Sequence, residues 1–238
     1  MKLTVVNSNS NGNSYVLTSS DGQQLCIEAG RPLKEVKTFA KLHTADCVGV
    51  IVSHSHGDHC RYIKDFLRAG IPAYSTYDVA STALGVVPIN SGETYHLGDF
   101  SVAPVPVVHD VPCLSFLIHH PEMGSLYFFT DAFTMDNVIR GCSVYMCECN
   151  YDDRLLDSAV SSGKTPRSQA DRIRLSHMSL SHAISFMHQC QADKTARRII
   201  LIHGSERHLN KPDAIDEFQQ ALGVATFFAE KSVTFNLS

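Results

Sequence analysis

Residues 51–60, IVSHSHGDHC, place three histidines and one aspartate within six positions, directly after a run of β-branched residues. A strand that ends just before them would deliver His54 and His56, which are two positions apart, to one metal ion. Asp58 and His59 follow at the start of the next helix, far enough along the chain to reach a second ion. Because a single Zn²⁺ ion cannot easily use all of these side chains, the stretch predicts half of a two-metal site rather than a histidine-rich polar turn.

The composition bounds the class of protein. The 238 residues suit one large domain, residues 1–238, and the apolar fraction of 44% and charged fraction of 18% are ordinary for a soluble globular protein. The net charge of −4 gives no general attraction to nucleic acid, so polyanion binding needs a local basic patch or bound metal ions. No segment has the apolar length of an export signal or a membrane span, and the eight cysteines are scattered. We therefore expect a cytoplasmic protein with free thiols and no membrane contact.

Short strands and helices alternate along the whole chain. Apolar runs and turn residues predict strands at 3–7, 14–18, 22–30, 47–53, 100–108, 113–119, 125–130, 143–150, 198–202, 224–229 and 232–237. Apolar residues at helical spacing predict helices at 32–42, 59–70, 179–191 and 212–221. The stretch between residue 150 and the third of these helices is expected to be irregular. Many strands look antiparallel, which favours packed sheets with helices outside them.

The spacing of the opening histidines and aspartate resembles the ligand motif of the metallo-β-lactamase superfamily. That resemblance implies further ligands that each follow a strand. The sequence has His109 in VPVVHD, Asp131 in LYFFTDAF and His203 in RRIILIHGS, each directly after an expected strand. The fold that the resemblance implies is α/β, a four-layer αββα sandwich with the metal ions at one edge of the two facing sheets.

The resemblance also implies which residues share a metal ion. The first ion would be held by His54, His56 and His109, and the second by Asp58, His59 and His203. Asp131 would bridge the two ions together with a hydroxide. Because these ligands offer nitrogen and oxygen atoms and no cysteine is among them, two Zn²⁺ or Mn²⁺ ions per chain are expected.

Features far from the histidine cluster favour one branch of the superfamily. Asp131 stands where the commonest β-lactamases carry cysteine, and the interval to His203 is too short for the cap of the β-CASP nucleases. RNase Z-like enzymes carry an acidic residue after the bridging aspartate and a histidine that opens a later helix; MCECNYDD supplies Glu148 and LSHMS supplies His177. NSNSNGNSYVL, ECNYDDRLL and LIHGSERHLN are closer still to the bacterial YycJ/WalJ-like branch, which is associated with exonuclease activity on DNA. The sequence departs from that branch at CIEAG, where Glu28 replaces the usual aspartate.

The same resemblance implies catalytic roles. Glu148 would fix the tautomer and charge of His177, so that this histidine can bind the phosphoryl group or protonate the leaving oxygen. Asp58 is expected to be catalytic as well as a ligand. Without the resemblance, His177 is more simply explained as a residue beside a helix that Ser179 caps. The basic stretch KTPRSQADRIR is either a solvated loop or a phosphate-binding element that uses Arg167, Arg172 and Arg174.

These residues predict a dinuclear metal-dependent hydrolase of phosphodiesters, with nucleic acid as its partner and exonuclease-like cleavage as its reaction. Hydrolysis of a small phosphodiester such as a cyclic nucleotide, or of another ester, is the alternative within the same fold. A non-catalytic binding module that metal stabilises is the alternative of a different class, but a structural site does not need so many ligands or a bridging carboxylate. A homodimer is compatible with the sequence.

Overall fold

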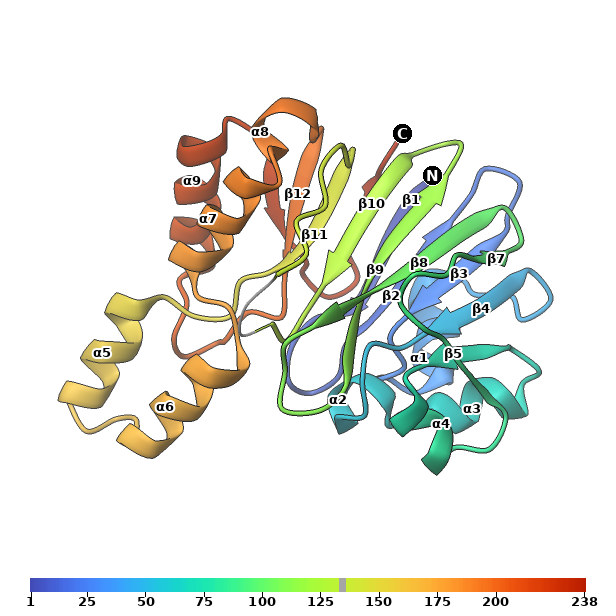
Figure 1. Ribbon diagram of the computed structural model, residues 1–238, viewed down its shortest axis with the longest axis horizontal. Helices are drawn as coiled ribbons and strands as arrows, with labels where there is room; N and C mark the ends of the chain where they lie inside the picture. Colours follow the sequence, from blue (N-terminus) through green and yellow to red (C-terminus); the bar gives the residue numbers. More distant parts are fainter. Residues whose placement is uncertain (133–135) are drawn as a thin grey trace.

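The computed structural model describes residues 1–132 and 136–238 and contains two sheets that face each other (Figure 1). The first sheet consists of β1 (Lys2–Asn7), β2 (Ser14–Thr18), β3 (Gln24–Ile27), β4 (Cys47–Ile51), β5 (Ala73–Ser75), β6 (Val86–Pro88) and β14 (Thr234–Asn236). The second consists of β7 (Tyr95–Leu97), β8 (Phe100–Val107), β9 (Cys113–His120), β10 (Gly124–Phe129), β11 (Val144–Glu148), β12 (Arg198–Ile202) and β13 (Thr226–Phe228). Their spatial orders are β14-β1-β2-β3-β4-β5-β6 and β13-β12-β11-β10-β9-β8-β7.

Helices cover the outer surface of each sheet, which confirms the αββα sandwich. Beside the first sheet lie α1 (Leu33–Ala40), α2 (Gly57–Cys60), α3 (Ile63–Arg68) and α4 (Tyr77–Thr82). Beside the second lie α7 (Leu180–Gln189), α8 (Ala192–Thr195) and α9 (Lys211–Leu222), with α5 (Asp153–Ser161) and α6 (Arg167–Ser176) below them in Figure 1. None of the helices in the described parts of the chain is long and apolar enough to cross a membrane.

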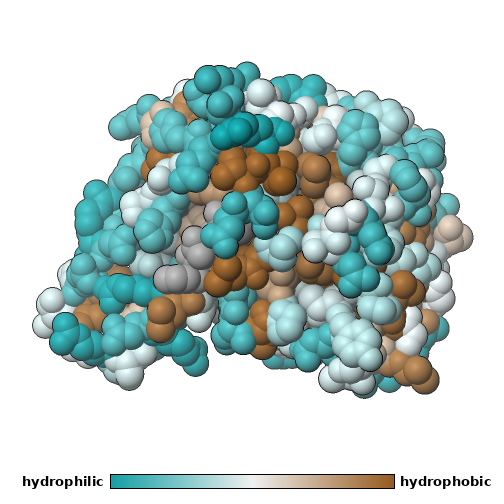
Figure 2. Space-filling view, viewed as in Figure 1, coloured by the Kyte–Doolittle hydropathy of each residue, from teal (hydrophilic) through white to brown (hydrophobic). Residues whose placement is uncertain are grey.

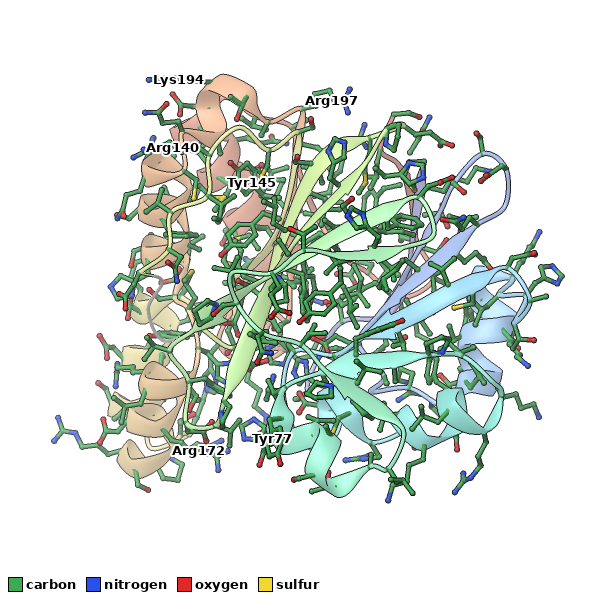
Figure 3. The ribbon with its side chains drawn as sticks, turned by 45° about the vertical axis from the view of Figure 1, so that its right-hand side comes forward. Tyr77, Arg140, Tyr145, Arg172, Lys194 and Arg197 are labelled. Atoms are coloured by element: carbon green, nitrogen blue, oxygen red, sulfur yellow. The ribbon has the colours of Figure 1, made fainter. Side chains whose placement is uncertain are left out.

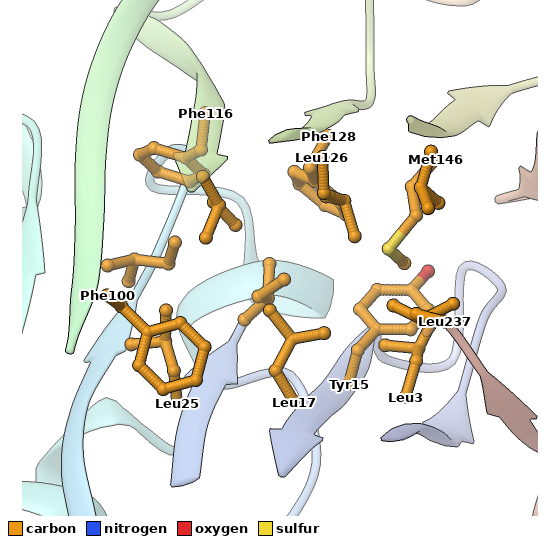
Figure 4. Close-up of a cluster of buried hydrophobic side chains, with 14 of the residues drawn as sticks. Leu3, Tyr15, Leu17, Leu25, Phe100, Phe116, Leu126, Phe128, Met146 and Leu237 are labelled. Carbon is orange, nitrogen blue, oxygen red and sulfur yellow. The ribbon is translucent and has the colours of Figure 1, made fainter. Parts of the chain in front are cut away.

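Side chains that alternate between the two faces of a strand allow one apolar strand to contribute to two cores, one between the sheets and one beneath the helices. In β2, Tyr15 and Leu17 point into the space between the sheets, where they belong to the same buried cluster as Phe128 of β10 (Figure 4). Val16, between them, packs on the opposite face with the residues of α1. Phe129 likewise follows Phe128 but packs against α7. Because successive strand residues point to opposite faces, each apolar run fills both the inner core and an outer one. The single-domain interpretation stays a prediction, which the shared inner core supports.

The pairing of the strands is only partly antiparallel. β14, β1, β2 and β3 pair antiparallel, as do β7, β8, β9 and β10. β3 to β6 and β10 to β13 pair parallel instead. Several parallel neighbours are joined through helices, as parallel connections require. This arrangement brings the carboxyl ends of neighbouring strands to one edge of each sheet.

The expectation of an irregular stretch after residue 150 was wrong, because α5 and α6 form a helical hairpin, residues 152–177. Only a few apolar side chains bury themselves between its helices, chiefly Leu156 and Ala170, so the sequence shows little helical periodicity. Thr165 Oγ1 lies 2.9 Å from His208 Nε2 and ties the turn of the hairpin to the sandwich. Figure 2 shows the hairpin as a lobe at the lower left that stands apart from the body of the molecule.

The predicted helix at 59–70 is two short helices, α2 and α3. The chain turns at Arg61 and Tyr62, where the Tyr62 N–H donates to the carbonyl of Ala29 at 2.9 Å. The apolar pattern alone would allow one continuous helix, but the hydrogen bond to Ala29 interrupts it at Tyr62.

Candidate metal centre

Strand ends bring the predicted ligands to one edge of the two sheets. β8, β10, β11 and β12 all run in the same direction, because β9 is antiparallel to both β8 and β10. One residue of the site lies at the end of each of these strands and of β4 in the facing sheet. In the order β4, β8, β10, β11 and β12, these residues are His54, His109, Asp131, Glu148 and His203. The structure therefore brings together side chains that lie up to about 150 positions apart in the sequence.

The loop with Asp58 and His59 is held against two other segments by backbone hydrogen bonds. The carbonyl of Asp58 accepts from the Asn13 N–H at 2.7 Å, and the carbonyl of His59 accepts from the Ala29 N–H at 2.7 Å. Gly30 lies directly beside them, and a Cβ added there would lie 1.8 Å from the Asp58 carbonyl oxygen. Close approach of the two backbones thus requires glycine at this position.

Replacing Gly30 with alanine is expected to destabilise the protein by ~3 kcal/mol or more, because neither backbone can retreat without breaking these hydrogen bonds. Gly223→Ala is the control: Gly223 has a φ of 65° and nothing within 4 Å of its added Cβ. Its alanine variant should show only backbone strain of ~1 kcal/mol. Urea unfolding measures both losses, and equal values would contradict the role of the close approach to Asp58.

His54, His56 and His109 form the first group of candidate ligands, with one ring nitrogen of each within 4.8 Å of the others. His54 is fully buried; its Nδ1 lies 2.8 Å from Ser53 Oγ, whereas its Nε2 has no hydrogen-bond partner within the described residues. Burial, aided by the charge of His59, holds the pKa of His54 well below its usual range. A neutral, buried imidazole with a free nitrogen is the form that binds a metal ion.

The second group of candidate ligands consists of Asp58, His59 and His203, and one ligand atom of each again lies within 4.8 Å of the others. Asp58 Oδ2 lies 3.3 Å from His59 Nε2 and 3.3 Å from His203 Nε2. Asp131 Oδ2 lies 2.8 Å from His59 Nε2, and Asp131 also forms a compact group with His54 and His59. The carboxylate of Asp131 therefore lies between the two groups of ligands.

Glu148 is fully buried and accepts hydrogen bonds on both of its oxygens. Oε1 lies 2.8 Å from His177 Nδ1 and 3.1 Å from His203 Nδ1, while Oε2 accepts from the Ala132 N–H at 3.0 Å. His177 Nδ1 is also 3.1 Å from Asp131 Oδ1. Glu148 thus orients two histidines, one in the second group of ligands and one beside it.

Opposite charges outweigh burial in setting the protonation of this cluster. Burial would raise the pKa of Asp131, but His203 and His59 hold it well below its usual range. Burial would lower the pKa of His177, but Glu148 and Asp131 raise it to about 10. Burial would also lower the pKa of His203, but nearby carboxylates, chiefly Asp131, raise it to about 9. The buried carboxylates therefore create a site that attracts positive charge.

The backbone is strained where the site is built. Glu28, Asp131 and His203 have φ values of 66°, 50° and 54°, a left-handed conformation that non-glycine residues seldom adopt. Asp131 and His203 each follow a strand, and Glu28 directly follows β3, with its Oε1 3.4 Å from His59 Nδ1. Such strain persists only where the surrounding structure determines it, and here it turns each side chain towards the cluster.

Two further side chains reach the site that the sequence did not predict there. Asn13 Nδ2 lies 3.1 Å from His59 Nε2. Asp110 Oδ1 lies 3.0 Å from His109 Nε2 and 3.4 Å from His56 Nε2. The signals were the density of asparagine in NSNSNGN and the aspartate that directly follows His109 in VPVVHD.

The structure separates the three arginines that were predicted to contact substrate. Arg172 lines a cavity of about 300 Å³, which we call the central cavity, together with His177, Ser10 and several of the candidate ligands. Figure 3 places Arg172 at the lower end of the molecule. Arg174 instead pairs with Asp157, and Arg167 does not line the central cavity.

The sequence profile of a family described as a β-lactamase superfamily domain matches residues 29–204. This chain belongs to the metallo-β-lactamase superfamily. Exodeoxyribonuclease YycJ of Bacillus anthracis is 26% identical to this superfamily member over 173 residues, which cover 66% of this chain and 65% of that relative. A metal-dependent hydrolase of Deinococcus radiodurans is 32% identical over 106 residues, 41% of this chain and 46% of that relative. The chain thus spans less than two thirds of the length of these curated relatives.

Solved structures of the superfamily share the fold of this member. The metallo-β-lactamase fold protein YhfI from Bacillus subtilis has a TM-score of 0.77 at 18% identity, with 98% of both chains covered. A diphosphatase of the PhnP family has a TM-score of 0.71 at 14% identity, covering 100% of this chain and 98% of that chain. The short form of human tRNase Z has a TM-score of 0.68 at 14% identity, with 100% of both chains covered. These structural matches confirm the fold, and the sequence match to YycJ confirms the predicted resemblance to that branch.

The donor atoms fit the divalent ions that membership of this superfamily implies. The groups of candidate ligands offer only imidazole nitrogens and carboxylate oxygens, the ordinary ligands of Zn²⁺ and Mn²⁺. The unpartnered Nε2 of buried His54 is the atom that a bound ion would satisfy.

Adding Zn²⁺ or Mn²⁺ to the metal-free protein is expected to raise its Tm by about 5 to 10 °C, because ions at a hundredfold excess over Kd add ~2.7 kcal/mol to the free energy of unfolding. His56→Ala should reduce this shift, since His56 is half-exposed and its loss leaves the core intact. His188→Ala, at an exposed position on α7, should retain the full shift. A Tm that neither ion changes would contradict a metal centre.

Proposed function

We propose that this protein is a dinuclear metal-dependent phosphodiesterase that cleaves nucleic acid in an exonuclease-like manner. The observation that carries the proposal is the pair formed by Glu148 and His177, whose Oε1 and Nδ1 lie 2.8 Å apart beside Asp131. A metal site that only stabilised a fold would have no use for an oriented imidazole at the wall of its cavity. The names of the YycJ and tRNase Z relatives support nucleic acid as the substrate.

In this proposal the ligands divide as the superfamily resemblance implies. One ion would be held by His54, His56 and His109 and the other by Asp58, His59 and His203, and Asp131 would be a ligand of both. Zn²⁺ and Mn²⁺ both suit these donors. Two such ions, when bound, lower the pKa of a shared water and stabilise negative charge on phosphoryl oxygens.

The remaining side chains handle the substrate. Glu148 fixes His177 through Nδ1, so its Nε2, which makes no hydrogen bond within the described residues, is left for the substrate. This nitrogen can bind a phosphoryl oxygen or hold a proton for the leaving oxygen. Asp58 lines the same central cavity and can accept a proton there. Arg172, at the rim, neutralises a neighbouring phosphate, a task that suits guanidinium geometry.

We also propose a reducing, cytoplasmic location. All eight cysteines are free, and most of them are buried as apolar side chains within the cores. A homodimer stays a prediction.

The proposal is tested by incubating metal-loaded protein with end-labelled single- and double-stranded DNA. We expect stepwise shortening from one end in the presence of Zn²⁺ or Mn²⁺, and none with the Asp58→Ala/His59→Ala variant. Cleavage by the wild type that does not exceed cleavage by this variant would rule out the proposed activity.

Competition separates a polymer from a small substrate. Hydrolysis of bis(p-nitrophenyl) phosphate should be inhibited by an oligonucleotide at lower concentration than by a cyclic nucleotide. Inhibition by the cyclic nucleotide alone would favour the small-phosphodiester alternative.

A further inference from the structure

A second cavity, of about 440 Å³, opens beside the central one, and we call it the side cavity. Its walls come from the β1–β2 loop, from α6 and from the loop that follows β12. Ser10, His177 and His203 line both cavities, so a ligand can extend from one into the other. The volume falls within the ~300–1,000 Å³ that small-molecule sites usually have.

The side cavity offers hydrogen-bonding groups that the protein itself does not use. The side-chain amides of Asn11 and Gln169 line it and form no hydrogen bond within the described residues. An amide presents both a donor and an acceptor, which matches the edge of a base or the hydroxyls of a sugar. Ile173 on α6 adds an apolar surface to the wall of the cavity, against which the face of a ring can pack.

The charge of the side cavity suits an anion. Arg207 lines it, is exposed, and forms no ion pair within the described parts of the chain. The neighbouring carboxylate of Glu206 is paired with Lys211, whose Nζ lies 3.1 Å from Oε1. The guanidinium of Arg207 is therefore available to a phosphate that lies beyond the first nucleoside.

We propose that the side cavity binds one nucleoside of the substrate, attached to the phosphate that lies in the central cavity. Gln169 and Asn11 bind the polar edges of the base or sugar, Ile173 packs against a ring, and Arg207 binds the next phosphate. This inference rests on the proposed function and deepens it. It makes Gln169 and Arg207 specificity-determining residues, because they contact parts of the substrate that do not react.

Two phosphodiesters test the inference, one with nucleosides and one without. With a dinucleoside monophosphate as substrate, Gln169→Ala is expected to lower kcat/KM about tenfold, mainly through KM. With methyl p-nitrophenyl phosphate, which has no nucleoside, the same variant should stay within twofold of the wild type. Gln220→Ala, at an exposed position on α9 outside the cavity, is the matched control and should change neither value.

A loss of equal size for both substrates, or no loss for either, would overturn the side cavity as a nucleoside site. Absence of hydrolysis of both substrates by the wild type would instead contradict the proposed function. Equilibrium binding then tests the cavity separately: a nucleoside monophosphate should bind at least tenfold more tightly than inorganic phosphate, and the Asn11→Ala/Gln169→Ala variant should remove that difference. Equal affinities of the wild type for the two ligands would overturn the inference.

Discussion

Replacing Asp131 with asparagine is expected to lower kcat/KM for metal-dependent phosphodiester hydrolysis by at least ~10³-fold, or about 4 kcal/mol of transition-state stabilisation. Asp131 is the carboxylate that lies between the two groups of ligands, with Oδ2 2.8 Å from His59 Nε2 and Oδ1 3.1 Å from His177 Nδ1. Asparagine keeps the shape of the side chain but removes its charge and one of its ligand oxygens. It also tolerates the φ of 50° at this position, so the backbone need not change.

Metal content provides a second measurement on the same variant. Elemental analysis should find two ions per chain in the wild type and at most one in Asp131→Asn. Asp193→Asn, an exposed position on α8, is the matched control and should keep both ions and full activity. Full occupancy combined with wild-type activity in Asp131→Asn would show that this carboxylate does not join the two ligand groups.

Replacing Glu148 with glutamine is expected to lower kcat by ~10²-fold while KM changes less than threefold, because Glu148 acts through the histidines that it orients. Its Oε1 accepts from two imidazole Nδ1 atoms and its Oε2 from a backbone N–H. The NH₂ group of a glutamine placed there must face either the two imidazole N–H groups or the backbone N–H, so on one side a donor meets a donor. The buried mismatch should cost ~2 kcal/mol of folding free energy.

The control for this variant is Glu230→Gln, since Glu230 is exposed and pairs with Lys211 on the surface. General destabilisation would also lower the apparent kcat without changing KM, but it would leave the shape of the pH–rate profile unchanged. A loss of positioning by Glu148 should change that shape, so the pH–rate profile separates the two. NMR titration of the His177 ring should show a lower pKa in Glu148→Gln, because the charge of Glu148 helps to raise it in the wild type. An unchanged pKa and an unchanged kcat would exclude this role of Glu148.

Much of the candidate site could be predicted from the sequence because its ligands are local or lie at strand ends. His54, His56, Asp58 and His59 share one short stretch, and their density and spacing predicted that they would lie at one site. The later ligands were implied by the superfamily resemblance, which requires a ligand after each of three apolar strands, and those strands could be recognised without knowing how they pair. The assignment of each ligand to an ion stays a prediction.

The remainder depended on contacts between distant segments. The approach of Gly30 to Asp58, and the place of Asn13 beside His59, arise only when loops from three regions meet at one edge. The helical hairpin was missed because its small core gives a weak apolar pattern. Parallel pairing was missed because strand direction depends on how each connection crosses the sheet, which the alternation of side chains does not record.

The hairpin formed by α5 and α6 has its own small core and is tied to the sandwich by few side-chain contacts. All of the candidate metal ligands belong to the sandwich, whereas Gln169, Arg172 and His177 belong to the hairpin or its end. The hairpin could therefore be exchanged or lengthened without altering the candidate metal ligands, and such a change would alter the side chains that we propose to contact the substrate. The same junctions, near residues 152 and 177, are where a protein engineer would graft a hairpin from another member of the superfamily.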